Sequence, residues 1–344
     1  MSSTFSQSPW AIETREVSRV YQTYVKPEGL ANSLKGFWKR QHKDKIALQP
    51  TTLQIPKGQI VGLVGANGAG KTTLLKVLSG LVRPSSGEAR VLGFNPAERD
   101  SRFLRQISIL LGQKNQLWWD LTPHDSYALL AEIYDLDKTA AKKRVHDLAE
   151  ILNCTHVLET QLRRLSLGER MKMEIIGALL HEPEVLYLDE PTIGLDIVAQ
   201  SSIRKFLEEY VALKKPTVIL TSHYMDDIAK LADRLLLISQ GSMVYDGTVE
   251  GFTRKTESKK LLRFSLAEPL AAALPIMNLH TLPAGEQNLS LQVTNEELAP
   301  VLSKITSLSG VKDITIDERD FEDVIREFLE KESRLLPSRG AHQP

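Results

Sequence analysis

The organisation of this chain follows from residues 65–73, which read Gly65-Ala66-Asn67-Gly68-Ala69-Gly70-Lys71-Thr72-Thr73. An apolar run at residues 60–64 precedes them, and residues 74–78 are mostly leucine and valine. These flanks predict a buried strand followed by a helix. Glycines in such a turn let backbone N–H groups surround an anion without a Cβ atom in the way, and the helix N-terminus adds partial positive charge. We therefore expect a phosphate-binding loop in an α/β fold.

Two side chains of this loop carry chemistry. In the pattern G-x-x-x-x-G-K-T, Lys71 is expected to reach the β- and γ-phosphates of a nucleotide, and the Thr72 hydroxyl is expected to bind Mg²⁺. A glycine-rich turn that matches by chance is the alternative. The predicted strand and helix on either side of the loop argue against it.

Size and charge limit the class of protein. The 344 residues are enough for one large α/β domain and a smaller second domain. Lys and Arg number 43 and Asp and Glu number 43, so no excess of positive charge points to nucleic acid as a partner.

The single cysteine, Cys154, excludes an internal disulfide and fits a reducing compartment. Although His156 is close, no second pair has the spacing of metal ligands, so we expect a packed thiol. The chain begins without a basic and apolar signal and contains no long apolar run. We therefore expect a cytoplasmic protein that does not span a membrane.

Two adjacent carboxylates, Asp189 and Glu190, end the apolar run of residues 185–188. Ligands of open α/β sheets bind at the carboxyl ends of the parallel strands. We expect Asp189 to hold Mg²⁺, directly or through water, and Glu190 to act as the general base on the attacking water. His223 ends the predicted strand at residues 217–222, where it would reach a γ-phosphate. The alternative is that the two acids at the strand end are only solvated and that His223 has a structural role.

A second candidate phosphate-binding surface lies at the start of a helix that is predicted from residue 166 to about residue 180. Ser166 and Glu169 have the S-x-x-E spacing of a capping box. Gly168 leaves the backbone of this helix start open to an anion. The capping role and the phosphate-binding role are compatible.

An insert at residues 22–45 separates two predicted strands, at residues 11–21 and 47–55. Leu30, Leu34, Phe37 and Trp38, together with Gln41, have helical spacing, and lysines and an arginine surround them. A basic amphipathic helix of this kind lies at a membrane surface or on a partner, or it packs on its own domain. The pattern leaves these alternatives open.

Residues 12–250 resemble the ATP-binding cassette of ABC transporters. Six motifs appear in the family's order: the Walker A loop GANGAGKTT, the Q-loop residue Gln113, the signature LSLGE at residues 165–169, Walker B LYLDE at residues 186–190, the D-loop ending at Asp196, and the switch histidine His223. The signature departs from the family pattern, because Leu167 replaces a glycine and Glu169 replaces a glutamine.

The resemblance implies a P-loop NTPase fold with a mostly parallel RecA-like sheet, an antiparallel β-subdomain and a helical subdomain. It implies ATP hydrolysis with Mg²⁺, with Gln113, Glu190 and His223 as catalytic residues and with Thr72, Gln113 and Asp189 at the metal. The residues expected on ATP are Tyr21 or its rival Tyr24 on the adenine, then Gly65, Asn67, Gly68, Ala69, Gly70, Lys71, Thr72 and Thr73, and finally Ser166, Gly168 and Asp196 from a second copy.

The resemblance also implies partners. A second copy of the chain pairs head to tail, and a separately encoded membrane permease places the protein at the cytoplasmic face of the cell membrane. Trp118 and Trp119 suit the groove that receives the permease, although tryptophans are also common in cores. The insert, with residues 30–41 as a membrane contact, resembles inserts of exporter cassettes, and import is the alternative direction of transport. A soluble ABC ATPase acting on ribosomes or another assembly is the alternative, but such proteins usually carry two cassettes.

The domain boundaries follow from these motifs. We expect the cassette over residues 1–250, a small α+β domain over residues 256–335 and a disordered tail at residues 336–344. In the small domain, residues 261–266, 289–294 and 311–317 are predicted strands, and residues 270–276, 296–308 and 321–331 are predicted helices. We identify no functional site there.

Overall fold

The computed structural model describes residues 8–24, 42–112, 115–222, 224–256, 260–269, 274–277, 280–318 and 321–335. The predicted amphipathic helix with Leu30, Phe37 and Trp38, the site residues Gln113 and His223, and the tail at 336–344 lie outside the described residues. The chain divides into two compact units between Gly247 and Thr248. We describe each unit separately.

A six-stranded sheet forms the centre of the first unit. Its strands are β3 (Ile60–Val64), β5 (Ile107–Leu111), β6 (Val185–Asp189), β7 (Thr217–Thr221), β8 (Arg234–Ser239) and β9 (Ser242–Thr248). The order across the sheet is β5-β6-β7-β3-β8-β9, and the pairs from β5 to β8 are parallel. Every residue of β6 and β7 is buried, as expected for parallel strands covered on both faces.

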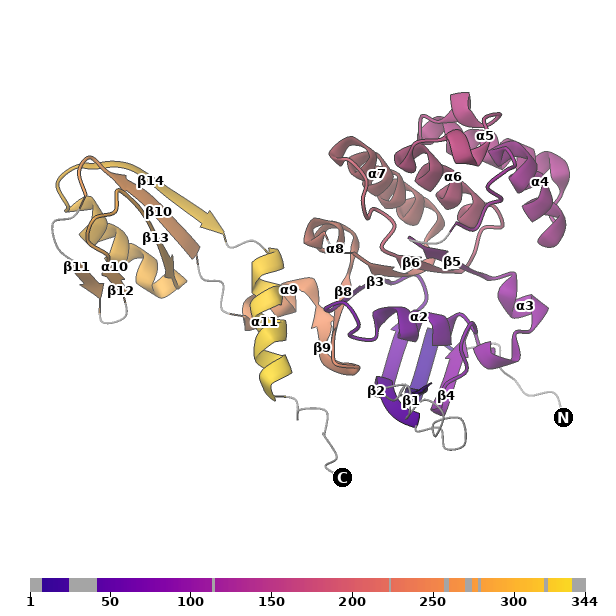
Figure 1. The fold of residues 1–344 in the computed structure, drawn as a ribbon, viewed down its shortest axis with the longest axis horizontal. Helices are drawn as coiled ribbons and strands as arrows, with labels where there is room; N and C mark the ends of the chain where they lie inside the picture. The colour runs from indigo at the N-terminus through magenta and orange to yellow at the C-terminus, as the bar shows by residue number, and fades with distance from the viewer. Residues whose placement is uncertain are drawn as a thin grey trace, which may run out of the picture. The chain divides into compact units, whose positions relative to one another are not determined.

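A three-stranded antiparallel sheet lies next to this core. It consists of β1 (Trp10–Tyr24), β2 (His42–Pro56) and β4 (Ser86–Val91), in the order β2-β1-β4. Helix α2 (Lys71–Leu78), which follows the phosphate loop, lies between the two sheets (Figure 1). The shared core includes Ile12, Leu48, Leu63, Leu74, Leu75 and Tyr187.

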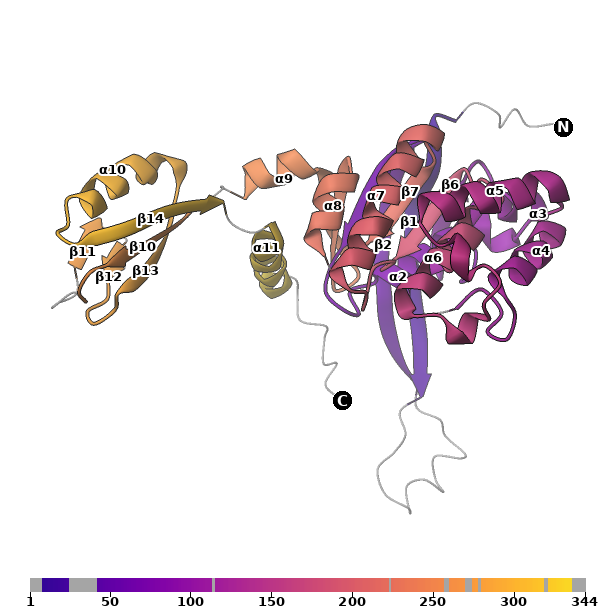
Figure 2. The same cartoon turned by 90° about the horizontal axis from the view of Figure 1, so that it is seen from above.

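The structure corrects the ends of the predicted insert. β1 continues past Tyr21 to Tyr24 and pairs with β2 up to His42, so residues 22–24 and 42–45 are strand and not part of a helical insert. The helical spacing seen in the sequence covers only residues 30–41. On either side of it each added residue pair continues the backbone ladder of the two strands. Figure 2 shows these paired strand ends projecting beyond the rest of the first unit.

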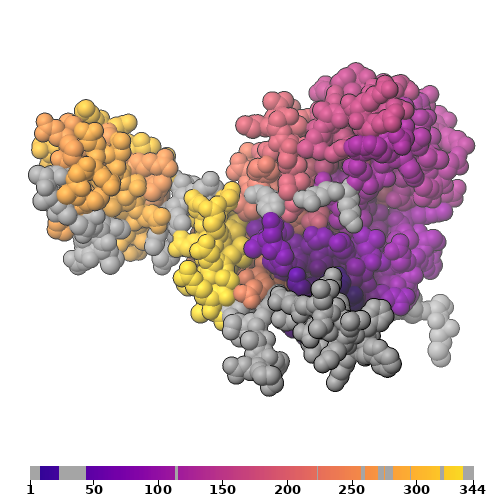
Figure 3. Space-filling view, in the orientation of Figure 1, coloured from indigo at the N-terminus to yellow at the C-terminus, as the bar shows by residue number. Residues whose placement is uncertain are grey.

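Helices cover the other side of the central sheet. They are α4 (Pro123–Ile133), α5 (Lys138–Ile151), α6 (Leu167–Leu179), α7 (Ile197–Lys214) and α8 (Met225–Leu231). Short helices η1 (Pro96–Glu98), α3 (Ser101–Leu104), η2 (Thr155–Val157) and η3 (Leu162–Arg164) occur in the connections. Thr122 and Asp137 cap α4 and α5, and the Tyr127 hydroxyl donates to the Met173 carbonyl at 2.9 Å, which ties α4 to α6. In the space-filling view α4–α6, coloured magenta to pink, gather at one end of the unit (Figure 3).

The second unit is a small α+β structure. Strands β10 (Lys260–Leu266), β13 (Asn288–Val293) and β14 (Val311–Glu318) form an antiparallel sheet in the order β13-β10-β14. Its helices are α9 (Val249–Lys255), α10 (Asn295–Thr306) and α11 (Phe321–Leu335). Leu262 and Phe264 of the sheet pack in one core with Val301 and Ile305 of α10.

One predicted helix of this unit is wrong. Residues 274–276 of the predicted helix at 270–276 instead belong to β11 (Leu274–Met277), which pairs with β12 (His280–Leu282). Pro275 has no backbone N–H to donate in a helix, and Leu274 gains a cross-strand partner in Leu282.

Candidate nucleotide-binding site

The phosphate loop joins the end of β3 to the start of α2, as predicted. A Cβ atom on Gly65 would lie 2.2 Å from the carbonyl oxygen of Ile238. Gly70 has φ +117, and a Cβ atom there would lie 2.6 Å from the carbonyl oxygen of Ala47. Both glycines are therefore required for close packing of the loop, while the exposed Asn67 and Gly68 form its open side.

Lys71 is held within the loop. Its side chain is buried, and Nζ donates to the carbonyl oxygen of Gly65 at 2.6 Å. Burial lowers the pKa of Lys71, and the negative charges of Glu190 and Asp189 oppose that shift. The Lys71 ammonium group thus lies where burial disfavours its charge and the two carboxylates partly compensate for that burial.

Asp189 meets the loop at the end of β6. One of its carboxylate oxygens accepts a hydrogen bond from Thr72 Oγ1 at 2.9 Å, and the other accepts one from Thr221 Oγ1 at 2.8 Å. The carboxylate is buried. A carboxylate and a threonine hydroxyl side by side are hard oxygen ligands of the kind Mg²⁺ binds next to nucleotide phosphates, so these residues fit the predicted metal.

Glu190 follows β6 in a left-handed backbone conformation, with φ 57. Its backbone N–H donates to both the carbonyl oxygen and Oγ1 of Thr221, at 3.1 and 3.0 Å. Gly112 approaches the same turn and donates its N–H to the Asp189 carbonyl at 2.7 Å. A non-glycine residue at positive φ stores strain, which is common at functional sites.

Ser166 caps α6, and the predicted capping box is confirmed. The Glu169 N–H donates to Ser166 Oγ at 3.3 Å, and Ser166 Oγ donates to Glu169 Oε2 at 2.7 Å. Hydrogen bonds from Ser166 lower the pKa of Glu169. Gly168 lies near Ala199 at the start of α7, since a Cβ atom on Gly168 would lie 3.1 Å from the Ala199 Cβ.

The residues predicted at the nucleotide, the second copy and the permease differ in their contacts and exposure. Asp196 caps α7 by accepting from the Ala199 N–H at 2.9 Å. The guanidinium carbon of Arg19 lies 4.5 Å from the centre of the Tyr21 ring, and nothing is described of the Tyr24 side chain. Trp118 and Trp119 are 40% and 44% exposed, so neither is packed in the interior.

Cys154 is a fully buried free thiol, which confirms the predicted packed thiol. Burial raises its pKa to about 11.

Sequence reasoning missed Thr221. Its hydroxyl contacts both Asp189 and the backbone of Glu190. The available signal was a hydroxyl residue at the end of a strand otherwise formed of apolar side chains, one strand away from the acids. That signal is weak, because Thr is also a common strand residue.

A buried lysine in a glycine-rich loop, facing a hydroxyl and two acids at a strand end, defines a P-loop nucleotide hydrolase. The comparisons with known proteins narrow this class. The model of the ABC transporter family matches residues 48–193. The ABC transporter ATP-binding protein NatA of Bacillus subtilis is 31% identical over 223 residues, which cover 64% of this chain and 90% of NatA.

Two further comparisons also match ABC transporter proteins. The daunorubicin resistance ATP-binding protein DrrA3 of Streptomyces coeruleorubidus is 31% identical over 273 residues, covering 79% of this chain and 84% of that protein. The structure of cbiO1 from Clostridium perfringens, part of the ABC transporter complex cbiONQ, aligns with a TM-score of 0.58 and 25% identity over 72% of this chain and 92% of cbiO1.

The chain belongs to the ATP-binding proteins of the ABC transporter family. The predicted fold class is confirmed, and the protein is an ATPase that binds ATP. The alternative of a soluble ABC ATPase acting on ribosomes is not supported. Among the helices in the described parts of the chain, none has the length and apolar character needed to cross a bilayer.

Proposed function

We propose that the chain is the motor subunit of an exporter, in which ATP hydrolysis drives a separate membrane permease. Relatives whose names refer to resistance against daunorubicin, linearmycin and doxorubicin support the exporter branch. The observation that carries the catalytic part is the contact of Thr72 with Asp189 beside the buried Lys71. The chemistry is hydrolysis of the β–γ phosphoanhydride bond of ATP by water.

Each residue has a role in this proposal. The backbone of the phosphate loop and Lys71 bind the phosphates. Thr72 and Asp189 would hold Mg²⁺, which would supply positive charge beside the transferred phosphoryl group. Glu190 accepts the proton of the attacking water. Gln113 and His223, which lie outside the described residues, are proposed at the metal and at the γ-phosphate, and Tyr21 or Tyr24 at the adenine.

A second copy of the chain is proposed to complete the site. Ser166 and Gly168 at the start of α6, and Asp196 at the start of α7, would close on the ATP of the partner copy. The neighbouring apolar side chains Leu167, Ile197 and Val198 are 40%, 83% and 79% exposed. Exposed apolar residues beside two helix starts are characteristic of an interface, and nucleotide would favour the closed pair through contacts that only that state makes.

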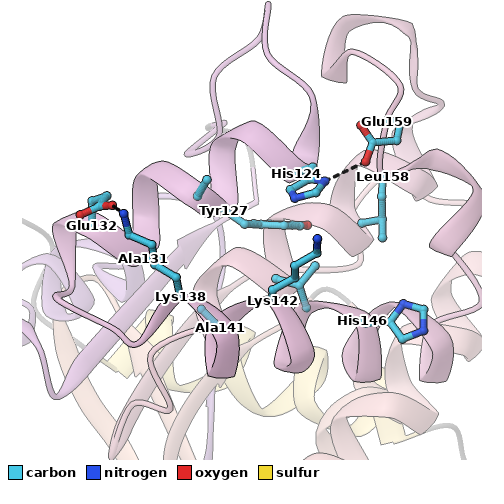
Figure 4. Close-up of a pocket in the computed structure, with 12 residues that line it drawn as sticks. His124, Tyr127, Ala131, Glu132, Lys138, Ala141, Lys142, His146, Leu158 and Glu159 are labelled. Atoms are coloured by element: carbon cyan, nitrogen blue, oxygen red, sulfur yellow. Dashed lines mark hydrogen bonds and ion pairs between the residues drawn. The ribbon is translucent and has the colours of Figure 1, made fainter.

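A permease segment is proposed to dock beside Trp118 and Trp119. Their loop is held by backbone bonds from Arg163 to Trp119 and from Leu162 to Leu121. A cavity of about 500 Å³ lies between α4 and α5, lined by residues that include Tyr127, Lys142, Val145 and Leu158. Figure 4 shows Lys142 pointing toward the Tyr127 ring and the His124–Glu159 pair at one end. Apolar anchors of the permease would occupy this cavity.

The peripheral position at the cytoplasmic face of the membrane is part of the same proposal. The basic segment at residues 30–41 is proposed as an additional membrane contact. A variant lacking residues 30–41 should co-sediment less with membranes than the parent. Full co-sedimentation of this variant would exclude the segment as an anchor.

The central experiment uses Glu190→Gln with ATP and Mg²⁺. We expect ATP to bind, turnover to fall by at least about a hundredfold because the general base is lost, and a dimer to accumulate in gel filtration with light scattering. A mutant that hydrolyses ATP at the parent rate would contradict the role of Glu190. A monomer at saturating ATP, with the permease present, would contradict the closed pair.

Permease docking is tested separately. The double variant Trp118→Ala, Trp119→Ala should lose co-purification with the permease, while Leu213→Ala, an exposed leucine on α7, should retain it. Equal capture of both variants would place the permease elsewhere.

A further inference from the structure

A buried carboxylate, Asp227, lies at the start of α8 and contacts three other segments of the chain. Asp227 Oδ2 accepts hydrogen bonds from Thr192 Oγ1 and from Ser222 Oγ, both at 2.9 Å. Arg204 Nε donates to Asp227 Oδ1 at 2.6 Å. Asp227 is 3% exposed, and Thr192 and Ser222 are also buried.

The three partners come from the segments that carry the proposed catalytic groups. Thr192 stands two residues after Glu190. Ser222 directly precedes residue 223, and its Oγ also accepts from the N–H of Tyr224 on the other side, at 2.9 Å. Arg204 lies on α7, the helix that Asp196 caps. One carboxylate thus joins the turn after β6, the turn after β7 and helix α7.

The carboxylate of Asp227 needs hydrogen-bond partners in defined positions, which fixes the geometry of the segments around it. A buried carboxylate is costly unless its oxygens are paired, and here the Arg204 guanidinium and the hydroxyls of Thr192 and Ser222 supply those partners. Because charge-assisted hydrogen bonds are strong and directional, the two turns cannot shift independently of Asp227. A purely apolar contact at this point would leave the spacing of the turns less well defined.

We propose that Asp227 is a positioning residue for ATP hydrolysis. It sets the separation between the backbone that carries Glu190 and the backbone on either side of residue 223, with Arg204 as its counter-ion. The inference rests on the proposed role of Glu190. Asp227 is buried and is not one of the residues proposed to bind ATP, so its loss should act on the chemical step and leave ATP binding intact.

The matched variants are Thr192→Val and Thr192→Ser. Valine keeps the size of threonine but removes the hydroxyl that donates to Asp227, and serine keeps the hydroxyl. We expect Thr192→Val to lower kcat by about tenfold or more with KM for ATP within about twofold of the parent, and Thr192→Ser to recover most of kcat. A kcat within twofold of the parent in Thr192→Val, or a loss that serine does not recover, would overturn the proposal.

A second pair of variants separates positioning from general stability. The chain contains another Arg–Asp pair, in which Arg234 Nε and Nη2 donate to the two oxygens of Asp246, each at 2.6 Å. That pair joins β8 to β9 and contacts none of the proposed site residues in the described part of the chain. We expect Asp227→Asn to lower kcat and Asp246→Asn to leave it unchanged, with the melting temperature of each recorded. Equal losses of kcat in both would overturn the proposal.

Glu190→Gln is measured alongside these variants. If Glu190→Gln keeps the parent rate, the proposed function fails. If Glu190→Gln loses turnover while Thr192→Val and Asp227→Asn keep it, only the role of Asp227 fails.

Discussion

Replacement of Gly112 by alanine tests how closely the end of β5 approaches the turn that carries Glu190, the proposed general base. Gly112 has no left-handed φ, so its backbone conformation is open to alanine. A Cβ atom on Gly112 would lie 2.3 Å from the carbonyl oxygen of Glu190 and 2.8 Å from that of Asp189. Contacts under 3.0 Å essentially never occur for real Cβ atoms. The Glu190 carbonyl must therefore retreat by about 0.7 Å or the end of β5 must move away.

Two consequences follow from this displacement. Overpacking of this kind lowers the free energy of unfolding by about 1–3 kcal/mol, which lowers the melting temperature by about 2–12 °C for a domain of this size. A shift approaching 1 Å of the residue proposed as the general base costs up to about a hundredfold in kcat. The loss of activity should thus be far larger than the loss of folded protein explains.

The assay is steady-state ATP hydrolysis at 25 °C, with the melting temperature measured by circular dichroism. Gly285→Ala is the control, because Gly285 has φ +86 and open space around its Cβ position. Alanine there is strained by about 1 kcal/mol but should leave kcat unchanged. If Gly112→Ala retains more than half of the parent kcat and melts at the parent temperature, the close approach at Gly112 does not position the turn that carries Glu190.

Two other expectations concern single side chains. Lys71→Ala removes a buried ammonium group from the loop and should weaken ATP affinity by at least about tenfold in a fluorescent-nucleotide titration. The control Lys76→Ala, on the same helix, should leave the affinity unchanged. Equal affinities of the parent and Lys71→Ala would exclude the phosphate contact. For Cys154, burial raises the pKa to about 11, so at pH 8 the native thiol should react with a disulfide reagent about a hundredfold more slowly than the unfolded chain. The raised pKa favours the protonated thiol, so the contribution of Cys154 to folding stability is present below pH 9 and is lost as the pH rises toward 11. Rapid labelling of the native protein at pH 8 would show that Cys154 is not packed.

Local patterns were sufficient for much of the site. The glycine loop, the strand ending in Asp189 and Glu190, and the capping box of Ser166 and Glu169 were all predicted correctly in type and position. Each depends on residues within a few positions of one another, so hydrophobic periodicity and backbone hydrogen bonding reveal it.

Local sequence patterns predicted the wrong secondary structure or element ends where strand pairing with a distant segment competes with local preference. Residues 22–24 and 42–45 joined a long hairpin, and residues 274–277 became a strand. In both regions the partner strand supplies hydrogen bonds that the local spacing of apolar residues does not reveal.

The residues alone therefore established a phosphate loop, two acids and a family of ATPases, because those features are local and chemically demanding. Only the folded chain brought Thr221 to Asp189, Gly112 to Glu190, and Asp227 to Thr192 and Ser222. These contacts depend on the strand order β5-β6-β7-β3, which places neighbours in the sheet that are far apart along the chain. Strand order arises from the packing of the whole domain, so no short segment encodes it.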